Sequence, residues 1–228
     1  MHWKWWLLAL PVIAVTVLIT YEDFGLWPSL GFFALVIPAA FYFFSQDSRG
    51  LSAIMKPIAA RYGGTLSPAT LMNFPQLHFE AEGRLHAIHA MPKAGASSLP
   101  GPFTFVRLTL PFDSGHQAGV RQVPARVRGA VAAIAPQLQA TTADPAFDKA
   151  FRLEGRDQAI MAELLNDELR ARLVASQLPA LHLRIAGAEI NVFIDGLAKA
   201  TAEIEEMIAL AGTLADRCQN AELPIKRL

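Results

Sequence analysis

The sequence has little cysteine and no excess of charge of either sign. One cysteine, Cys218, occurs among 228 residues, which excludes an intramolecular disulfide and fits a reducing compartment. Lys and Arg together number 20, as do Asp and Glu, so the formal net charge is zero. A loose basic stretch at Arg121, Arg126 and Arg128 is interpreted as a solvated loop rather than a site for phosphate or lipid headgroups. Without the dense basic patch of a nucleic-acid-binding protein, we expect no nucleic-acid partner.

Short motifs with a known chemistry are also missing. The sequence contains no GxxxxGK[ST], HExxH, GxSxG or CxxC motif, and no glycine-rich turn between a strand and a helix that would bind a dinucleotide. Cys218 falls on the apolar stripe of an expected helix, which favours a core residue over a nucleophile. No catalytic residue, cofactor or metal is therefore predicted.

Two long apolar runs without charge lie near the N-terminus, at residues 5–21 and 26–44. Each is long enough, at about 1.5 Å per helical residue, to cross a hydrocarbon core of about 30 Å. Pro11 and Pro38 interrupt the runs, but membrane helices tolerate proline. We predict a transmembrane helical hairpin over residues 1–48 in a bacterial inner membrane. A cleaved signal peptide at residues 5–21 is disfavoured, because no small-x-small cleavage site follows it.

Flanking charge predicts the orientation of this hairpin. Cations lie outside the pair of runs, at Lys4 before it and at Arg49, Lys56 and Arg61 after it. The loop between the runs carries Glu22 and Asp23 and no cation. The positive-inside rule then places both termini, and a domain formed by residues 49–228, in the cytoplasm.

Periodicity predicts a mixed α+β fold for that domain. After a polar break at residues 46–50, a short helix is expected over residues 51–62, with Gly63 and Gly64 ending it. A hairpin follows, in which a three-residue loop at residues 81–83 with a left-handed Gly83 joins two strands. This register pairs Glu80 with Arg84 and His78 with His86, and it puts Leu77, Phe79, Leu85 and Ala87 on the buried face.

Further strands and helices are expected downstream. Residues 91–101 and 111–124 read as loops, residues 103–110 as a central strand, and the stretch to Pro136 as a strand or a helix. Residues 147–154 read as a strand. Asp157 and Asn166 are expected to cap two helices, the second with Leu169, Leu173 and Val174 inward and Arg170 and Arg172 outward.

A second hairpin has a two-residue turn at Gly187 and Ala188, which pairs residue 185 with 190 and residue 183 with 192. The last helix covers residues 197–218. The fold class is therefore α+β, with a mainly antiparallel sheet of two or more hairpins covered by helices.

Residues 144–216 resemble a pattern found in a family of uncharacterised bacterial membrane proteins with two N-terminal spans and a cytoplasmic α+β domain. The pattern is D-P-x-F-D-x-x-F, then a Leu-Leu pair, then E-L-R. Here it comprises Asp144, Pro145, Phe147, Asp148, Phe151, Leu164, Leu165, Glu168, Leu169 and Arg170. The resemblance covers about a third of the chain and implies the fold and the topology, but no catalytic residues.

Three groups of residues have the types found in reactive sites. His78, His86 and His89, with Glu80, could bind zinc, but a regular strand puts His89 on the other face, so a polar sheet surface is favoured. The stretch from Asp113 through Ser114 and Gly115 to His116 has the residue types of a hydrolase triad, but adjacent residues do not converge on one point, which favours a turn. Asp144 and Asp148 could act as an acid–base pair, and capping explains them more simply.

A well-patterned domain without clustered reactive groups favours a non-enzymatic role. The leading hypothesis is a membrane-anchored domain that binds a partner protein, or a second copy of itself, or organises a complex at the inner membrane. The alternative is a membrane-associated enzyme, such as a hydrolase, whose dispersed residues would form a deep polar pocket. A third hypothesis is an accessory subunit whose spans pack against a larger membrane protein through the small residues Gly31, Ala34, Ala39 and Ala40.

Overall fold

The computed structural model describes residues 26–70, 73–91, 102–123 and 141–221, and between residues 26 and 43 it describes side chains only at Ala34 and Tyr42. The chain divides into two units, residues 1–47 and 48–228. The first expected span, residues 5–21, lies outside the described residues, and the second, residues 26–44, is helical. Among the described residues, no helix is both long enough and apolar enough to cross a membrane.

Helix α2 (Leu26–Tyr62) continues through the polar residues 46–50, so the predicted break there is wrong. The helix continues because Leu51, Met55 and Ile58, spaced three to four residues apart, are buried on one side of it. It ends before Gly63, whose φ of 64° is left-handed, as expected at a helix C-terminus.

Within its described residues, the second unit is built on one antiparallel sheet of eight strands, which confirms the α+β fold class. The strands lie in the order β1-β2-β3-β4-β8-β7-β5-β6. Their bounds are β1 (Thr65–Ser67), β2 (Gln76–Ala81), β3 (Arg84–Met91), β4 (Phe103–Thr109), β5 (Gln117–Gln122), β6 (Phe151–Gly155), β7 (His182–Ala186) and β8 (Glu189–Asp195). Every pairing between neighbouring strands is antiparallel. β4 lies in the middle, as its apolar residues predict.

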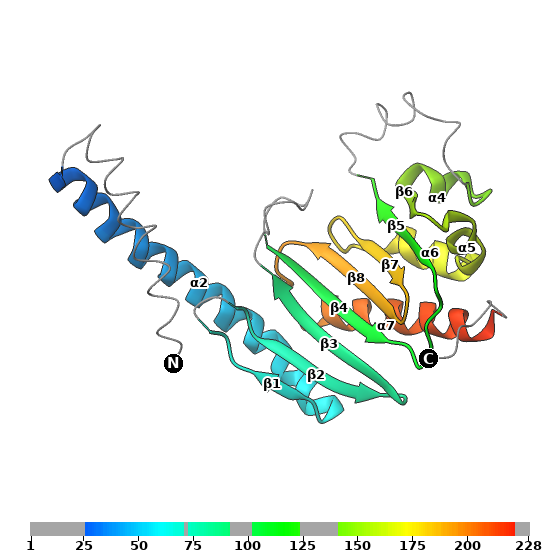
Figure 1. Cartoon of the computed structure of the whole chain (residues 1–228), viewed down its shortest axis with the longest axis horizontal. Coiled ribbons are helices and arrows are strands. Elements are labelled where there is room, and N and C mark those ends of the chain that lie inside the picture. Colours follow the sequence, from blue (N-terminus) through cyan, green and yellow to red (C-terminus); the bar gives the residue numbers. More distant parts are fainter. Residues whose placement is uncertain (1–25, 71–72, 92–101, 124–140, 222–228) are drawn as a thin grey trace. The chain divides into compact units, whose positions relative to one another are not determined.

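Helices cover one face of this sheet. Figure 1 shows α7 (Thr201–Asn220) behind β4 and β8, on which it packs. α5 (Gln158–Leu164) packs on β5 and β6, while α4 (Pro145–Ala150) contacts both β6 and α6 (Asp167–Ala175). The core between α7 and the sheet contains Val106, Leu108, Ile190, Val192, Ile204, Met207, Ala211 and Leu214, all buried. No helix in the described ranges covers the other face between β2 and β7, which is called the outer face below.

The first hairpin differs from its predicted register by one residue. Its loop is the two-residue turn Glu82-Gly83, with φ of 54° and 70°, so that Ala81 pairs with Arg84 and Glu80 with Leu85. A shift of one residue moves every side chain of β3 to the opposite face. The observed register buries Ile88 and Ala90 opposite Leu77 and Thr104, and it leaves Leu85 on the outer face.

Several other expectations are confirmed or corrected. The second hairpin has the predicted register, with Ile185 opposite Ile190 and Leu183 opposite Val192. The predicted loop 111–124 contains strand β5, and the predicted strand 147–154 begins as helix α4, because Asp144 caps that helix and Pro145 starts it.

The predicted burial of the helix after Asn166 is partly wrong. Asn166 caps α6 by accepting a hydrogen bond from the Leu169 amide. Leu169 and Leu173 are buried, but Val174 is 44% exposed. Arg170, expected to point outward, packs into a polar network between α4 and α6.

Candidate functional site

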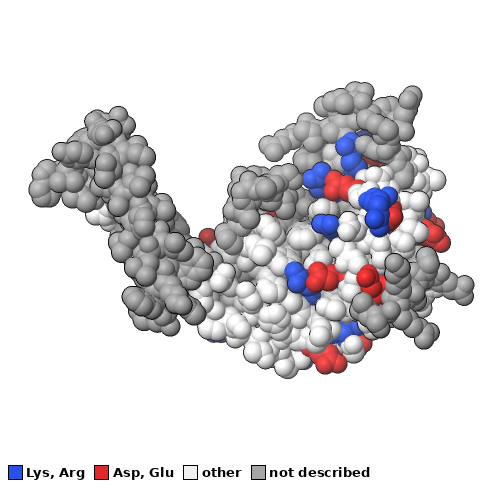
Figure 2. All heavy atoms as spheres, viewed as in Figure 1, with Lys and Arg blue, Asp and Glu red and all other residues white. Residues whose placement is uncertain are grey.

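Alternation along the strands determines which side chains reach the outer face. Residues i and i+2 of a strand lie on the same face of a sheet. In β3 and β4 the alternate residues that do not face the helices therefore lie on the outer face, and they include Leu85, Met91, Phe103 and Phe105. Both Leu85, 61% exposed, and Met91, 48% exposed, present large apolar side chains on this face. In Figure 2 this face shows an uncharged area beside a region where acidic and basic side chains intermingle.

A row of rings crosses the outer face over five strands. His78 of β2 meets His89 of β3 with ring centroids 5.2 Å apart, and His89 stacks on Phe105 of β4 at 5.0 Å. Phe105 then contacts Phe193 of β8 at 5.8 Å, and Phe193 contacts His182 of β7 at 5.6 Å. From His89 onward the row follows directly paired residues of neighbouring strands. We call these five residues the ring row.

Burial favours the neutral form of two histidines in the ring row, His89 and His182. Burial, then His78 and the nearby Arg107, lower the pKa of His89 to about 4. Burial also lowers the pKa of His182, against the opposing effect of the Glu154 carboxylate. Neutral imidazoles stacked on phenyl rings present flat, weakly polar faces, so this surface is suited to apolar and aromatic contacts.

A small hollow lies at the end of the ring row, where Gly119 of β5 replaces a side chain. Gly119 pairs with Arg184 on one side and with Glu154 on the other. A Cβ at this position would lie 3.1 Å from the Leu183 carbonyl oxygen, so glycine keeps the hollow open. Its volume is about 130 Å³.

The hollow contains an imidazole–carboxylate pair. His182 Nε2 lies 3.4 Å from Glu154 Oε2, while Glu154 Oε1 is 2.5 Å from Arg121 Nη2. Arg184 lines the same hollow and has no hydrogen bond or ion pair with any other described residue. A histidine beside a carboxylate can act as a base. However, no described residue brings a hydroxyl or thiol to the hollow, and its volume is far below the ~300 Å³ of a small ligand pocket. The arrangement therefore fits a contact surface better than a reaction centre.

The histidines considered for metal binding separate onto two faces. His86 is on the inner face, where it stacks on Phe79, whereas His78 and His89 meet on the outer face. The predicted pairing of His78 with His86 is thus wrong, because it assumed the three-residue loop. No group of three or more His, Cys, Asp or Glu side chains that could hold a metal ion occurs within the described ranges.

The stretch from Asp113 to His116 forms a polar turn. Ser114 Oγ donates to the Gly187 carbonyl at 2.8 Å and accepts from the His116 amide, so it holds the turn against the second hairpin. His116 Nδ1 lies 3.7 Å from Asp157, and no contact joins its imidazole to Ser114. Asp157 starts α5 without a side-chain cap, and a hydrogen bond from the Gln117 amide lowers its pKa.

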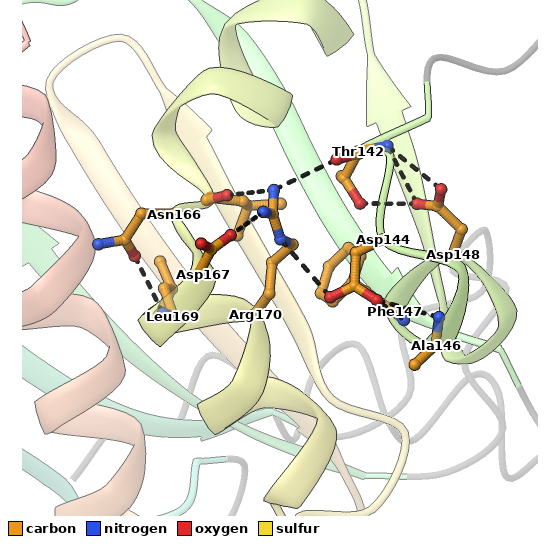
Figure 3. Close-up of polar contacts among 10 residues, drawn as sticks. Thr142, Asp144, Ala146, Phe147, Asp148, Asn166, Asp167, Leu169 and Arg170 are labelled. Carbon is orange, nitrogen blue, oxygen red and sulfur yellow. Dashed lines mark hydrogen bonds and ion pairs between the residues drawn. The ribbon is translucent and has the colours of Figure 1, made fainter.

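The pair Asp144 and Asp148 belongs to a structural network (Figure 3). Asp144 accepts from the first free amides of α4, and Asp148 accepts from both the amide and the hydroxyl of Thr142. Arg170 donates to the Leu165 carbonyl at 2.8 Å and lies 3.7 Å from Asp144. The D-P-x-F-D and E-L-R residues thus connect α4 with α6, which explains the pattern by structure alone.

Two further residues are accounted for by their surroundings. Cys218 is fully buried against the sheet, and burial raises its thiol pKa to about 12, as expected of a core residue. Arg121 lies in β5 rather than in a loop, whereas Arg126 and Arg128 lie outside the described residues.

Comparison with known proteins finds one informative structural likeness. No protein-family model and no curated protein matches the sequence. The crystal structure of the mycobacterial trehalose monomycolate transport factor A, TtfA, is similar, with a TM-score of 0.52 and 8% sequence identity. The match covers 79% of this chain and 99% of that one. At this identity the likeness shows a shared fold.

Proposed function

We propose that this chain is a membrane-anchored, non-enzymatic accessory protein whose second unit binds a partner protein through its outer face. The observation that carries the proposal is the outer face itself, on which Leu85 and Met91 expose large apolar side chains on either side of the ring row. Large apolar side chains exposed on a face that no described helix covers are a feature of interaction sites. Aromatic residues and Met are also enriched at the centres of protein interfaces.

The expected partner presents apolar side chains with a carboxylate at one end. Phe193, Leu85 and Met91 offer apolar contacts, while Arg184 provides a cation that no described residue neutralises. A carboxylate facing Arg184 could form a bidentate pair, which gives orientation as well as affinity. A second copy of this chain is the competing occupant, and the test below separates the two.

The anchor and the location belong to the same proposal. The uncharged runs 5–21 and 26–44 would cross the inner membrane as a hairpin, and the flanking cations would keep both termini and the domain of residues 49–228 in the cytoplasm. The fold likeness to a transport factor gives loose support to an accessory role. The same spans would also pack against a larger membrane protein through Gly31, Ala34 and neighbouring small residues.

The test is co-purification of the full-length chain in mild detergent. Leu85→Glu with Met91→Glu places two charges on the outer face at exposed positions, so the fold is kept and the partner should be lost. Val174→Glu is the matched control, because Val174 is a similarly exposed apolar residue on α6. A wild-type chain that purifies alone as a monomer would overturn the proposal, and one that purifies as a dimer lost in the double variant would identify a second copy as the occupant.

The enzymatic alternative centres on His182 and Glu154. A water-activating pair would lose nearly all turnover on substitution of His182, whereas partner binding tolerates His182→Phe because the ring row keeps its aromatic contact. Retained partner binding in His182→Phe favours the accessory role.

A further inference from the structure

A second hollow lies beside α2 in the part of the helix that belongs to the second unit. Its volume is about 330 Å³. Five of its lining residues come from one side of the helix, and the sixth comes from the segment after β1. They are Ser48, Arg49, Ser52, Ala53, Lys56 and Ala69. Spacings of three, four and seven residues place the polar groups in a single stripe along the helix.

The charge in this hollow is positive and not neutralised. Arg49 and Lys56 are exposed, and neither makes an ion pair or a hydrogen bond with a described residue. Arg61, farther along α2, instead forms an ion pair with Glu205. None of the described residues that line the hollow is acidic, so the electrostatic potentials of the two cations add and attract an anion.

A buried hydroxyl in the same hollow has no partner. Ser48 is only 5% exposed, and its Oγ makes no hydrogen bond to any described residue. Leaving a buried hydroxyl unpaired is unfavourable, and such groups in native proteins normally have a partner. An oxygen-rich ligand in the hollow would satisfy Ser48 and would neutralise Arg49 and Lys56 at the same time.

We propose that this hollow binds a phosphate-type anion, supplied by the headgroup of an anionic phospholipid. The Arg49 guanidinium can hold two phosphate oxygens, Lys56 adds a point charge, and the Ser48 and Ser52 hydroxyls can donate to the remaining oxygens. Arg49 lies five residues beyond Phe44, which is about 7–8 Å of α-helix. The lipid source rests on the proposed function, because it requires residues 26–44 to cross the bilayer, so that the helix emerges at headgroup level.

The experiment measures the melting temperature of the full-length chain in nonionic detergent against three probes. Dihexanoyl phosphatidylglycerol should raise it, because a ligand that binds only the folded state stabilises that state. Dihexanoyl phosphatidylcholine, which has no net charge, should not raise it. Inorganic phosphate should act at least about tenfold more weakly than phosphatidylglycerol, since it lacks the glycerol and acyl contacts.

Substitutions assign the effect to the hollow. Arg49→Gln and Lys56→Gln should each weaken the phosphatidylglycerol effect about tenfold, as expected for the loss of one charged hydrogen-bonding group. Arg61→Gln, which removes one positive charge from the same helix outside the hollow, should leave the effect intact. Ser48→Ala should weaken the effect without lowering the melting temperature of the lipid-free protein, because an unpaired hydroxyl is removed.

The outcomes separate this proposal from the proposed function. Equal stabilisation by phosphate and phosphatidylglycerol, lost in Lys56→Gln, would keep the anion site and overturn the lipid as its source. No stabilisation by either, or an effect that survives Arg49→Gln and Lys56→Gln, would overturn the site itself. The partner test uses Leu85 and Met91, which do not line this hollow, so either proposal can fail while the other stands.

Discussion

His86 stacks on Phe79 across the first hairpin, with ring centroids 4.8 Å apart and planes 6° from parallel. The pair is on the inner face, where burial, then the charge of Arg84, lower the pKa of His86 to about 4. The histidine therefore contributes to the core as a neutral aromatic ring, and its Nδ1 has no hydrogen-bond partner among the described residues.

This position of His86 makes stability depend on pH. The folded-state pKa is below the unfolded value of 6.5, so the unfolded chain binds more protons between pH 6.5 and 4, and stability is lost as pH falls through this window. We expect the free energy of unfolding to fall by about 1–2 kcal/mol from this residue between pH 7 and 5. His86→Phe should remove that part of the slope while keeping the stack, as measured by urea denaturation at the two pH values. An unchanged slope in His86→Phe would show that His86 is not buried in neutral form.

Arg170 makes a different kind of contribution, as a polar connection between helices. Its side chain is 15% exposed, and it reaches the Leu165 carbonyl as well as Asp144 and Asp167. Arg170→Met should lower the free energy of unfolding by about 1–3 kcal/mol, because the Leu165 carbonyl and Asp144 lose a charged partner. Asp167 is 97% exposed, so Asp167→Ala should cost under about 1 kcal/mol. Urea denaturation would measure both, and equal costs would contradict the structural role assigned to Arg170.

Two substitutions in the hollow at Gly119 should shift the pKa of His182 in opposite directions. Glu154 raises the pKa of His182, while Arg121 and Arg184 lower it, on top of the larger lowering by burial. Glu154→Gln should therefore move the His182 titration to lower pH, and Arg184→Gln should move it to higher pH. NMR titration of the His182 Cε1–H signal would measure both shifts, with Arg61→Gln as a control distant in sequence. Shifts in the same direction for the two variants would contradict the described geometry.

Local sequence patterns predicted many of the strands and helices, but they did not predict which side chains meet on the outer face. The second hairpin was predicted correctly, because its Gly187 turn and the alternation of its apolar residues agree on one register. β5 was missed because its sequence, QAGVRQ, has Gly119 and few apolar residues, and only the pairing with β6 and β7 makes it a strand. The ring row could not be foreseen, since it depends on which distant strands become neighbours, and sequence spacing does not contain that information.

The first hairpin shows how one residue of loop length decides which surface a strand exposes. A two-residue type I′ turn needs left-handed backbone at both central positions, and Glu82 and Gly83 have φ of 54° and 70°. Nothing lies within 4 Å of a Cβ added at Gly83, so an alanine there would be strained by its backbone alone. We expect Gly83→Ala to lower the free energy of unfolding by about 1–2 kcal/mol.

Glu82→Asn should have the opposite effect, since asparagine tolerates left-handed backbone better than glutamate does. We expect a gain of about 0.5–1 kcal/mol in the free energy of unfolding, measured by urea denaturation. In the three-residue loop predicted from the sequence, Gly83 would be the left-handed residue, and Glu82→Asn would be neutral. A Glu82→Asn variant with unchanged stability would therefore favour the three-residue loop over the described turn. In that register Leu85 would lie in the core, so it would not belong to the surface assigned to partner binding.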